Sequence, residues 1–231
     1  MNIDFKKFEE LSGMVFKDKE LLRQAFTHRS YINENKGLKF DHNERLEFLG
    51  DAVLELVITD YLYSKYTDKT EGDMTAFRSA LVNANTCSQI ATNLQVNEFL
   101  LLSKGEAKDT GRARQYILAN TLEAIIGAIY LDQGYEKAKK FILDNFSPLT
   151  DEIISSRSWM DSKSLFQEKS QEIESITPSY KTIREAGPDH DKRFTVGVYL
   201  GNELVVSGEG QSKQEAEQDA ASKALKLKNW R

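Results

Sequence analysis

The chain has 231 residues, of which 40% are hydrophobic and 29% charged, with 31 Lys and Arg against 36 Asp and Glu. This composition is ordinary for a soluble globular protein and excludes collagen-like, disulfide-scaffold and wholly disordered classes. The length allows one large domain or two small ones. Taken alone, the net charge of −5 argues against a nucleic-acid partner.

Neither a membrane span nor a secretory leader is expected from the sequence. No stretch approaches the roughly 18 apolar residues of a span, and residues 1–10 lack the apolar run of a signal peptide. The single Cys87 cannot form an internal disulfide, which fits a reducing compartment. We therefore expect a cytoplasmic protein that contacts no membrane.

The first 147 residues contain no proline, which suits a long helical domain because proline disrupts helix interiors. Apolar residues recur at helical spacing in four stretches, each of which predicts a helix. These stretches are 21–26, 46–63, 77–84 and 117–131. The sequence thus predicts an all-α domain over residues 1–155.

The pattern changes after this point. Residues 156–162 are mostly small and polar without periodicity, which is typical of a linker. Three short runs of β-branched and aromatic residues follow a helical stretch, and a last helix begins at Ser212. The helices are predicted at 164–174 and 212–226, and the strands at 179–185, 194–200 and 203–208. The sequence therefore predicts a small α+β domain with the order α-β-β-β-α over residues 163–231.

Three acidic residues lie inside the most apolar predicted helix. Glu44, Glu47 and Asp51 are spaced i, i+3 and i+7, so they share one face over about 10 Å. Their apolar neighbours predict a mostly buried helix, in which carboxylates are costly unless they are paired or bind metal. Gly50 costs about 1 kcal/mol in a helix interior, which indicates close approach by another segment or a ligand.

Asn120 and Glu123 share a face at the start of another apolar helix. Oxygen ligands from two helices are what Mg²⁺ prefers, with water and substrate phosphate completing its shell. Such an ion can lower the pKa of a bound water and stabilise a leaving oxygen. The alternative is that these are ordinary acidic residues on solvated helix faces, and spacing alone supports the two interpretations about equally.

An unbroken string across the first acidic group resembles the signature of the ribonuclease III family. Residues 43–54 read Asn-Glu-Arg-Leu-Glu-Phe-Leu-Gly-Asp-Ala-Val-Leu. Segments at 25–31, 71–83 and 117–132 resemble the surroundings of that signature, and residues 208–221 resemble part of a double-stranded-RNA-binding domain. The resemblance covers nearly the whole chain and implies a bacterial-type endonuclease domain followed by an RNA-binding domain.

The resemblance also implies roles for individual residues. Glu47, Asp51 and Glu123 match Mg²⁺ ligands, Asp51 and Glu123 being catalytic, with Mn²⁺ as a substitute ion. Glu44 and Glu71 match acidic positions that line the cleft between the subunits of a homodimer. The implied reaction is cleavage of double-stranded RNA by a metal-activated water, in rRNA and mRNA processing. Its products would carry 5′-phosphate and 3′-hydroxyl ends with short 3′ overhangs.

Asn120 departs from the family pattern, which has Asp at this position. Asn keeps a carbonyl oxygen that can ligate Mg²⁺, but it removes one negative charge, so ion affinity should fall or a second ion should be harder to hold. The residue is either natural to this lineage or a variant built to trap a complex. The alternative function is therefore a duplex-RNA-binding protein with impaired catalysis.

The RNA-binding prediction rests on shape recognition of the duplex through phosphates and 2′-hydroxyls. Ser212 and Lys213 open the last helix, where backbone N–H groups and the helix dipole favour phosphate. Gln167 and Glu168 on the preceding helix and His190 in a strand-connecting loop are the other predicted contacts there. A basic cluster just before Asn120 is predicted to contact phosphate, with a solvated loop as the alternative. This cluster comprises Lys104, Lys108, Arg112 and Arg114.

The acidic excess lies entirely in the helical part. Residues 1–155 carry 19 basic and 24 acidic side chains, whereas residues 156–231 carry 12 of each. A metal ion at the proposed site would offset part of this charge. The acidity is therefore compatible with an RNA partner, and duplex binding is expected to depend on divalent metal as well as on salt.

Overall fold

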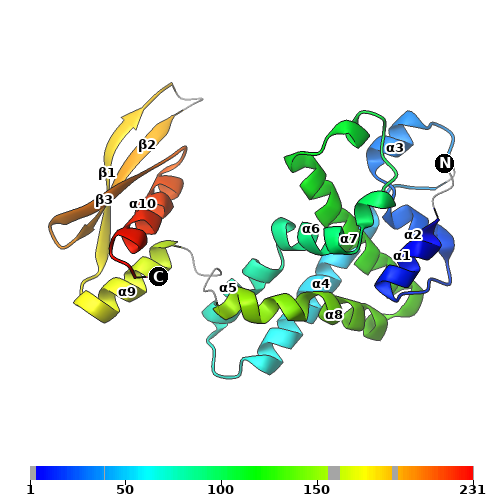
Figure 1. Cartoon of the computed structure of the whole chain (residues 1–231), viewed down its shortest axis with the longest axis horizontal. Coiled ribbons are helices and arrows are strands. Elements are labelled where there is room, and N and C mark those ends of the chain that lie inside the picture. Colours follow the sequence, from blue (N-terminus) through cyan, green and yellow to red (C-terminus); the bar gives the residue numbers. More distant parts are fainter. Residues whose placement is uncertain (1–3, 39, 156–161, 189–191, 231) are drawn as a thin grey trace. The chain divides into compact units, whose positions relative to one another are not determined.

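The computed structural model describes residues 4–38, 40–155, 162–188 and 192–230 (Figure 1). The chain divides into two compact units, Met1–Trp159 and Met160–Arg231. Within the described residues the first unit is helical, and the second contains a three-stranded antiparallel sheet and two helices. The predicted fold class is thus confirmed. None of the described helices is both long and apolar enough to cross a membrane.

The helical unit is built mainly from three long helices and several shorter ones. The long helices are α4 (Glu44–Lys65), α7 (Arg112–Gln133) and α8 (Tyr135–Ser155). The shorter ones are α1 (Phe5–Ser12), α2 (Lys19–Ala25), α3 (Arg29–Glu34), α5 (Glu71–Leu81) and α6 (Ala84–Asn93), with 3-10 turns at Val96–Glu98 and Glu106–Lys108.

Polar side chains at the helix starts explain several of these boundaries. The Asp18 carboxylate accepts hydrogen bonds from two backbone N–H groups at the start of α2. Thr70 and Asp73 form a reciprocal capping box at α5, and the Asn83 side chain accepts from the Thr86 N–H at α6. Each cap satisfies donors that a helix end would otherwise leave unpaired.

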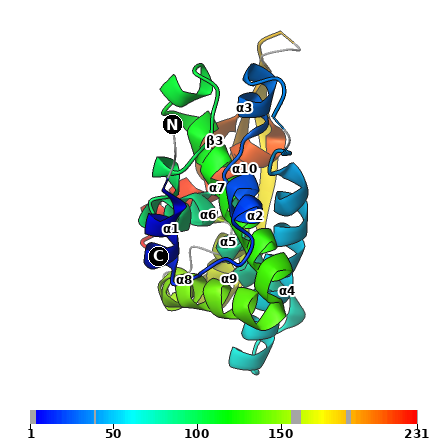
Figure 2. The same ribbon diagram turned by 90° about the vertical axis from the view of Figure 1, so that its right-hand side faces the viewer.

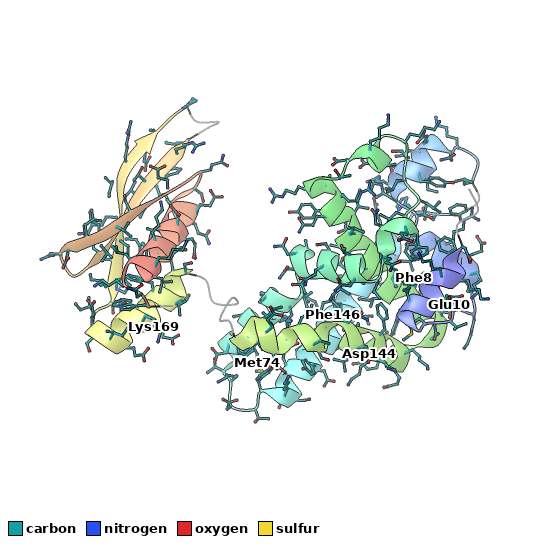
Figure 3. The ribbon with its side chains drawn as sticks, viewed as in Figure 1. Phe8, Glu10, Met74, Asp144, Phe146 and Lys169 are labelled. Carbon is teal, nitrogen blue, oxygen red and sulfur yellow. The ribbon has the colours of Figure 1, made fainter. Side chains whose placement is uncertain are left out.

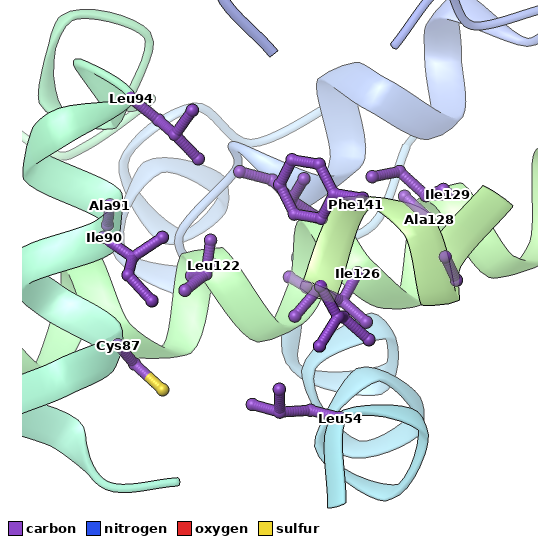
Figure 4. Packing of buried hydrophobic residues seen from close by; sticks show 14 of the residues in the cluster. Leu54, Cys87, Ile90, Ala91, Leu94, Leu122, Ile126, Ala128, Ile129 and Phe141 are labelled. Carbon is purple, nitrogen blue, oxygen red and sulfur yellow. The ribbon is translucent and has the colours of Figure 1, made fainter. Parts of the chain in front are cut away.

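The core of this unit is arranged around α7, which passes through its middle (Figures 1 and 2). Leu122 and Ile126 of α7 are fully buried, and they lie among Leu54 of α4, Ile90 of α6 and Phe141 of α8 (Figure 4). Cys87 is buried in the same cluster. Burial raises the pKa of its thiol to about 12, so Cys87 is a packed core residue rather than a nucleophile.

The helices α4 and α7 cross at a pair of glycines. A Cβ atom at Gly50 would overlap the backbone carbonyl of Glu123, and one at Gly127 would overlap the carbonyl of Leu46. The backbones therefore approach more closely than any side chain would permit. This confirms that another chain segment approaches Gly50, and that segment is α7.

The sequence analysis predicts no helix over the residues of α8, and Pro148 lies inside this helix. Proline removes one backbone hydrogen bond from a helix, but the apolar face of α8 is anchored by Phe141 and Phe146, both buried. Figure 3 labels Phe146 together with the exposed Asp144 of the same helix. Tertiary packing along one face thus outweighs the local effect of proline.

The second unit has the element order α-β-β-β-α. Its elements are α9 (Ser162–Glu174), β1 (Pro178–Ala186), β2 (Arg193–Leu200), β3 (Glu203–Gly210) and α10 (Lys213–Leu227). The strands pair in the order β1-β2-β3, and Gly201, with φ +59°, supplies the left-handed residue in the hairpin between β2 and β3.

Both helices of this unit contribute to one small core. Phe166 of α9, Val198 of β2 and Ala220 of α10 are fully buried, and Trp230 stacks on Phe166 with ring centroids 5.4 Å apart. Gly208 lets α10 lie directly on β3, because a Cβ there would overlap the backbone of Ala220. The predicted linker, 156–162, lies outside the described residues except for Ser162, which begins α9.

Candidate functional site

The crossing of α4 and α7 brings together the acidic residues predicted on the two helices. Glu47 lies one turn before Gly50 on α4, and its carboxylate is hydrogen-bonded by the side chain of Asn120 on α7. A cavity of about 280 Å³ opens beside them. Its lining consists of His28, Asn43, Glu44, Glu47, Tyr116, Ile117 and Asn120.

The carboxylates at this crossing disfavour one another's ionisation. Burial, followed by the charges of Asp51 and Glu47, raises the pKa of Glu123 to about 7. Burial and then the Glu44 charge raise the pKa of Glu47, and the Asn120 hydrogen bond acts in the opposite direction. Burial and the Glu55 charge raise the pKa of Asp51. A cation placed among these groups would reverse these shifts.

The expectation that α4 is mostly buried is wrong. Phe48 is 82% exposed, and Leu56 and Tyr63 are also exposed on this helix. Glu44 and Asp51 are exposed, while Glu47 is partly buried. The reason is that α4 buries one face against α7 and leaves the opposite face uncovered, so the carboxylates lie along the boundary between the two faces.

The donor set is made of oxygen atoms, which suits a hard divalent cation. Among the residues that the structure describes, no three Asp, Glu, His or Cys side chains converge closely enough to form a ready-made metal cluster. The coupling among Glu47, Asp51 and Glu123 is electrostatic. Because their donors are oxygen atoms and their negative charges oppose one another, these residues fit a divalent cation, although they do not converge on a ready-made site.

The two predicted cleft residues lie in different places. The Glu44 carboxylate pairs with Arg29 at 3.1 Å and lines the same cavity as Glu47. Glu71, in the first turn of α5, lines a separate cavity of about 210 Å³ together with Tyr63, Met74 and Arg78, among others. Within one chain, the structure brings Glu44 but not Glu71 beside Glu47.

The basic cluster before Asn120 divides into structural and exposed members. The guanidinium of Arg114 donates to the Asn97 side chain at 2.8 Å and to the Glu106 carbonyl at 2.6 Å, so it ties the loop together. Arg112 is exposed and lies against Tyr116, with its guanidinium carbon 5.8 Å from the ring centre. Lys108 is exposed at the end of a 3-10 turn. Arg114 is therefore engaged within the protein.

In the second unit, the predicted contact residues are exposed where they are described. Gln167 and Glu168 are exposed on α9, and Lys213 is exposed in the first turn of α10. The Ser212 hydroxyl caps α10 by accepting from the Glu215 N–H at 3.1 Å. His190 lies outside the described residues.

Three neighbours of these sites were absent from the sequence prediction. Asn43, 3% exposed, donates its side-chain amide to the Ala25 carbonyl at 3.2 Å and so fixes the start of α4. Tyr116 lines the cavity beside Glu47. Glu185 pairs with Lys213 at 2.8 Å. The position of Asn43 in the signature string is a sequence signal, whereas no local pattern points to the other two.

Comparison with known proteins decides the family. A profile described as Ribonuclease-III-like matches residues 18–149, and one described as a double-stranded RNA binding motif matches residues 162–228. The protein named Ribonuclease 3 from Enterococcus faecalis is 46% identical over 220 residues, which is 95% of each chain. The chain belongs to the ribonuclease III family.

Other members of the ribonuclease III family agree with this assignment. Ribonuclease 3 from Protochlamydia amoebophila is 46% identical over 215 residues, covering 92% of this chain and 87% of that one. A crystal structure of the nuclease domain of ribonuclease III from Campylobacter jejuni is 43% identical. It covers 63% of this chain and 97% of that one, with a TM-score of 0.55. The chain is thus an enzyme of the ribonuclease III family, as its sequence resemblance implied.

Proposed function

We propose that this protein is a divalent-metal-dependent endonuclease that cleaves double-stranded RNA. The observation that carries the proposal is the α4–α7 crossing, where the charges of Asp51 and Glu47 raise the pKa of Glu123. Glu47 and Asn120 line an open cavity at the same crossing. The double-stranded RNA binding motif at residues 162–228 supplies the means of holding the substrate. Incubation of the protein with a long RNA duplex and Mg²⁺ should yield short duplexes, while single-stranded RNA should remain intact.

The residues proposed to hold the ion are Glu47, Asp51, Asn120 and Glu123. Mg²⁺ is the expected ion, with Mn²⁺ as a substitute, since all four side chains offer oxygen. Such an ion lowers the pKa of its bound water and stabilises charge on the leaving oxygen. The Asn120 side chain orients the Glu47 carboxylate through their hydrogen bond, and Arg29 holds the neighbouring Glu44.

The proposed products have 5′-phosphate and 3′-hydroxyl ends, because water rather than the RNA 2′-hydroxyl would attack the phosphorus and displace the 3′-oxygen. The short 3′ overhangs would result from two active sites of a dimer that cut opposite strands at staggered positions. We further propose that the enzyme processes rRNA and mRNA in the cytoplasm. Gln167, Glu168, His190, Ser212 and Lys213 are proposed to contact the duplex from the second unit. Lys108 and Arg112 are proposed to contact phosphate near the cleavage site, which the exposure of both side chains supports.

A homodimer is proposed to complete the enzyme, with Glu44 and Glu71 lining the cleft between subunits. Phe48, Leu56 and Tyr63 are spaced eight and seven residues apart, so they form an exposed apolar stripe along α4. A structural study of the Campylobacter jejuni nuclease domain describes a region involved in dimer formation. A second copy of this chain would remove the stripe from water.

Replacement of Phe48 by Asp should convert the dimer to a monomer. In sedimentation equilibrium, the wild type should have a molecular mass of about twice the 26.3 kDa of the chain, and the variant a mass close to 26.3 kDa. Val15→Asp, which also places a charge at a well-exposed apolar position, should leave the sedimentation unchanged. A wild type that sediments as a monomer would rule out the dimer.

The alternative, a duplex binder with impaired catalysis, is distinguished by Asn120→Asp. If Asn120 is a competent ligand, the added carboxylate should lower the Mg²⁺ concentration for half-maximal rate by about tenfold, with kcat changing less than about threefold. The readout is the cleavage rate of a duplex across a Mg²⁺ titration. A rise in kcat of about a hundredfold or more would instead support impaired catalysis in the present sequence.

A further inference from the structure

A single carboxylate lies between two lysines at the end of the second unit where α10 begins. The strand register pairs Glu185 of β1 with Phe194 of β2, and Phe194 with Gly210 of β3. A Cβ on Gly210 would meet the backbone N of Ala216 at 2.6 Å, so the first turn of α10 packs against this end of the sheet. Glu185 and the start of α10 are therefore neighbours, although they are far apart in sequence.

Lys213, the first residue of α10, is held by this carboxylate. Its Nζ lies 2.8 Å from one oxygen of Glu185 and 5.6 Å from the centre of the Phe194 ring. Lys192 reaches the other oxygen of Glu185 at 3.6 Å and lies over the same ring at 6.0 Å. One carboxylate thus pairs with two lysines, and both ammonium groups lie over the ring of Phe194.

This arrangement sets up a competition for Lys213. The lysine stands at the N-terminus of α10, where an RNA phosphate is favoured by the helix dipole. A phosphate that approaches Nζ competes with a carboxylate already in contact, and it is repelled by that carboxylate as long as the carboxylate remains nearby.

We infer that Glu185 is an internal competitor of the RNA backbone, which holds Lys213 in the free protein and weakens duplex binding at this contact. The inference rests on the proposed binding of duplex RNA. It gives the enzyme a way to release cleaved duplex, since the carboxylate can take back the lysine as the phosphate leaves. The competition acts on charge, so it should be strongest at low salt.

The test is a binding titration of the full chain and its Glu185→Gln variant. The probe is an RNA duplex of about 20 base pairs, longer than the roughly 16 that one such domain spans. Fluorescence anisotropy without divalent metal avoids cleavage. The variant should bind about threefold to fivefold more tightly at low salt, the range expected for loss of one exposed ion pair. The gain should shrink as salt is raised, because a freed lysine steepens the salt dependence.

Two further variants separate competition from other effects. Glu174→Gln removes a carboxylate that pairs with Lys228. Lys228 lies about 22 Å along α10 from Lys213, so this variant should change duplex affinity by less than about 1.5-fold. In a Lys213→Gln background, Glu185→Gln should lose most of its gain, since the competitor acts through that lysine.

Each outcome bears on the inference. Tighter binding by Glu185→Gln, dependent on Lys213, supports it. Equal or weaker binding by Glu185→Gln, with a wild type that binds duplex RNA, overturns the inference and leaves the proposed function intact. Weaker binding would show instead that Glu185 positions Lys213 for phosphate. A wild type that binds no duplex RNA, with Mg²⁺ as well as without divalent metal, would overturn both.

Discussion

Glu123→Gln should lower the rate of duplex-RNA cleavage on the order of a thousandfold, while duplex binding measured without divalent metal should stay unchanged. The amide has nearly the same shape as the carboxylate but lacks the charge that a divalent cation requires. Glu123 is the carboxylate whose ionisation is opposed most strongly, by burial and by Asp51 and Glu47. The measurement is the initial rate on an end-labelled duplex at saturating Mg²⁺, with binding followed by anisotropy.

A measurement of stability would distinguish a loss of cleavage activity at the site from a loss caused by unfolding. The pKa of Glu123 is raised from 4.5 to about 7 in the folded chain, so the metal-free fold loses stability as the pH rises between these values and bears the full cost at pH 8. Glu123→Gln should therefore melt at a higher temperature than the wild type at pH 8 in EDTA. Glu98→Gln, which removes an exposed partner of Lys7, should leave the cleavage rate within about twofold. A Glu123→Gln rate within about threefold of wild type would refute the site assignment.

Gly50→Ala should lower the free energy of unfolding by about 3 kcal/mol, the upper end of the usual cost of overpacking. The added methyl group would overlap the backbone of Glu123, and a backbone cannot move aside as a flexible side chain can. The helices α4 and α7 would have to separate, which would also displace Glu47 from Asn120. Urea unfolding measures the loss, and the cleavage assay should show a parallel loss of activity.

Gly72→Ala provides the matched control. Gly72 lies in the first turn of α5, and a Cβ there would meet only the Thr70 side-chain oxygen, at 3.8 Å. Because Ala favours a helix over Gly by about 1 kcal/mol, this variant should be as stable as the wild type or more stable. A Gly50→Ala protein with wild-type stability would mean that the close approach of α4 and α7 does not hold in solution.

Local signals in the sequence predict which helices carry the candidate site residues. Glycine inside an apolar helix has a cost, so Gly50 indicates a close neighbour, and helical spacing places Glu44, Glu47 and Asp51 on one side. The sequence does not say which face of α4 stays exposed, because Phe48 and Leu56 are as apolar as the buried residues. Exposure there depends on what packs against the helix, which local pattern does not encode.

Contacts between distant segments explain the remaining differences. No local pattern predicts a helix over the residues of α8, which contains Pro148. The helix is stabilised by the packing of Phe141 and Phe146 in the assembled unit. In the sequence, Arg114 belongs to a basic cluster. In the folded loop its guanidinium donates a hydrogen bond to the Asn97 side chain. Glu185 and Lys213 are 28 positions apart in the chain, and only the sheet register brings them together.

The ends of the cleavage products test the central claim most directly. A defined RNA duplex should be incubated with the protein in Mg²⁺ and in EDTA, and the ends of both strands then identified. The account predicts cleavage in Mg²⁺ only, with 5′-phosphate and 3′-hydroxyl ends and short 3′ overhangs. Cleavage in EDTA, or products ending in a 2′,3′-cyclic phosphate, would contradict it, because the RNA's own 2′-hydroxyl would then be the nucleophile.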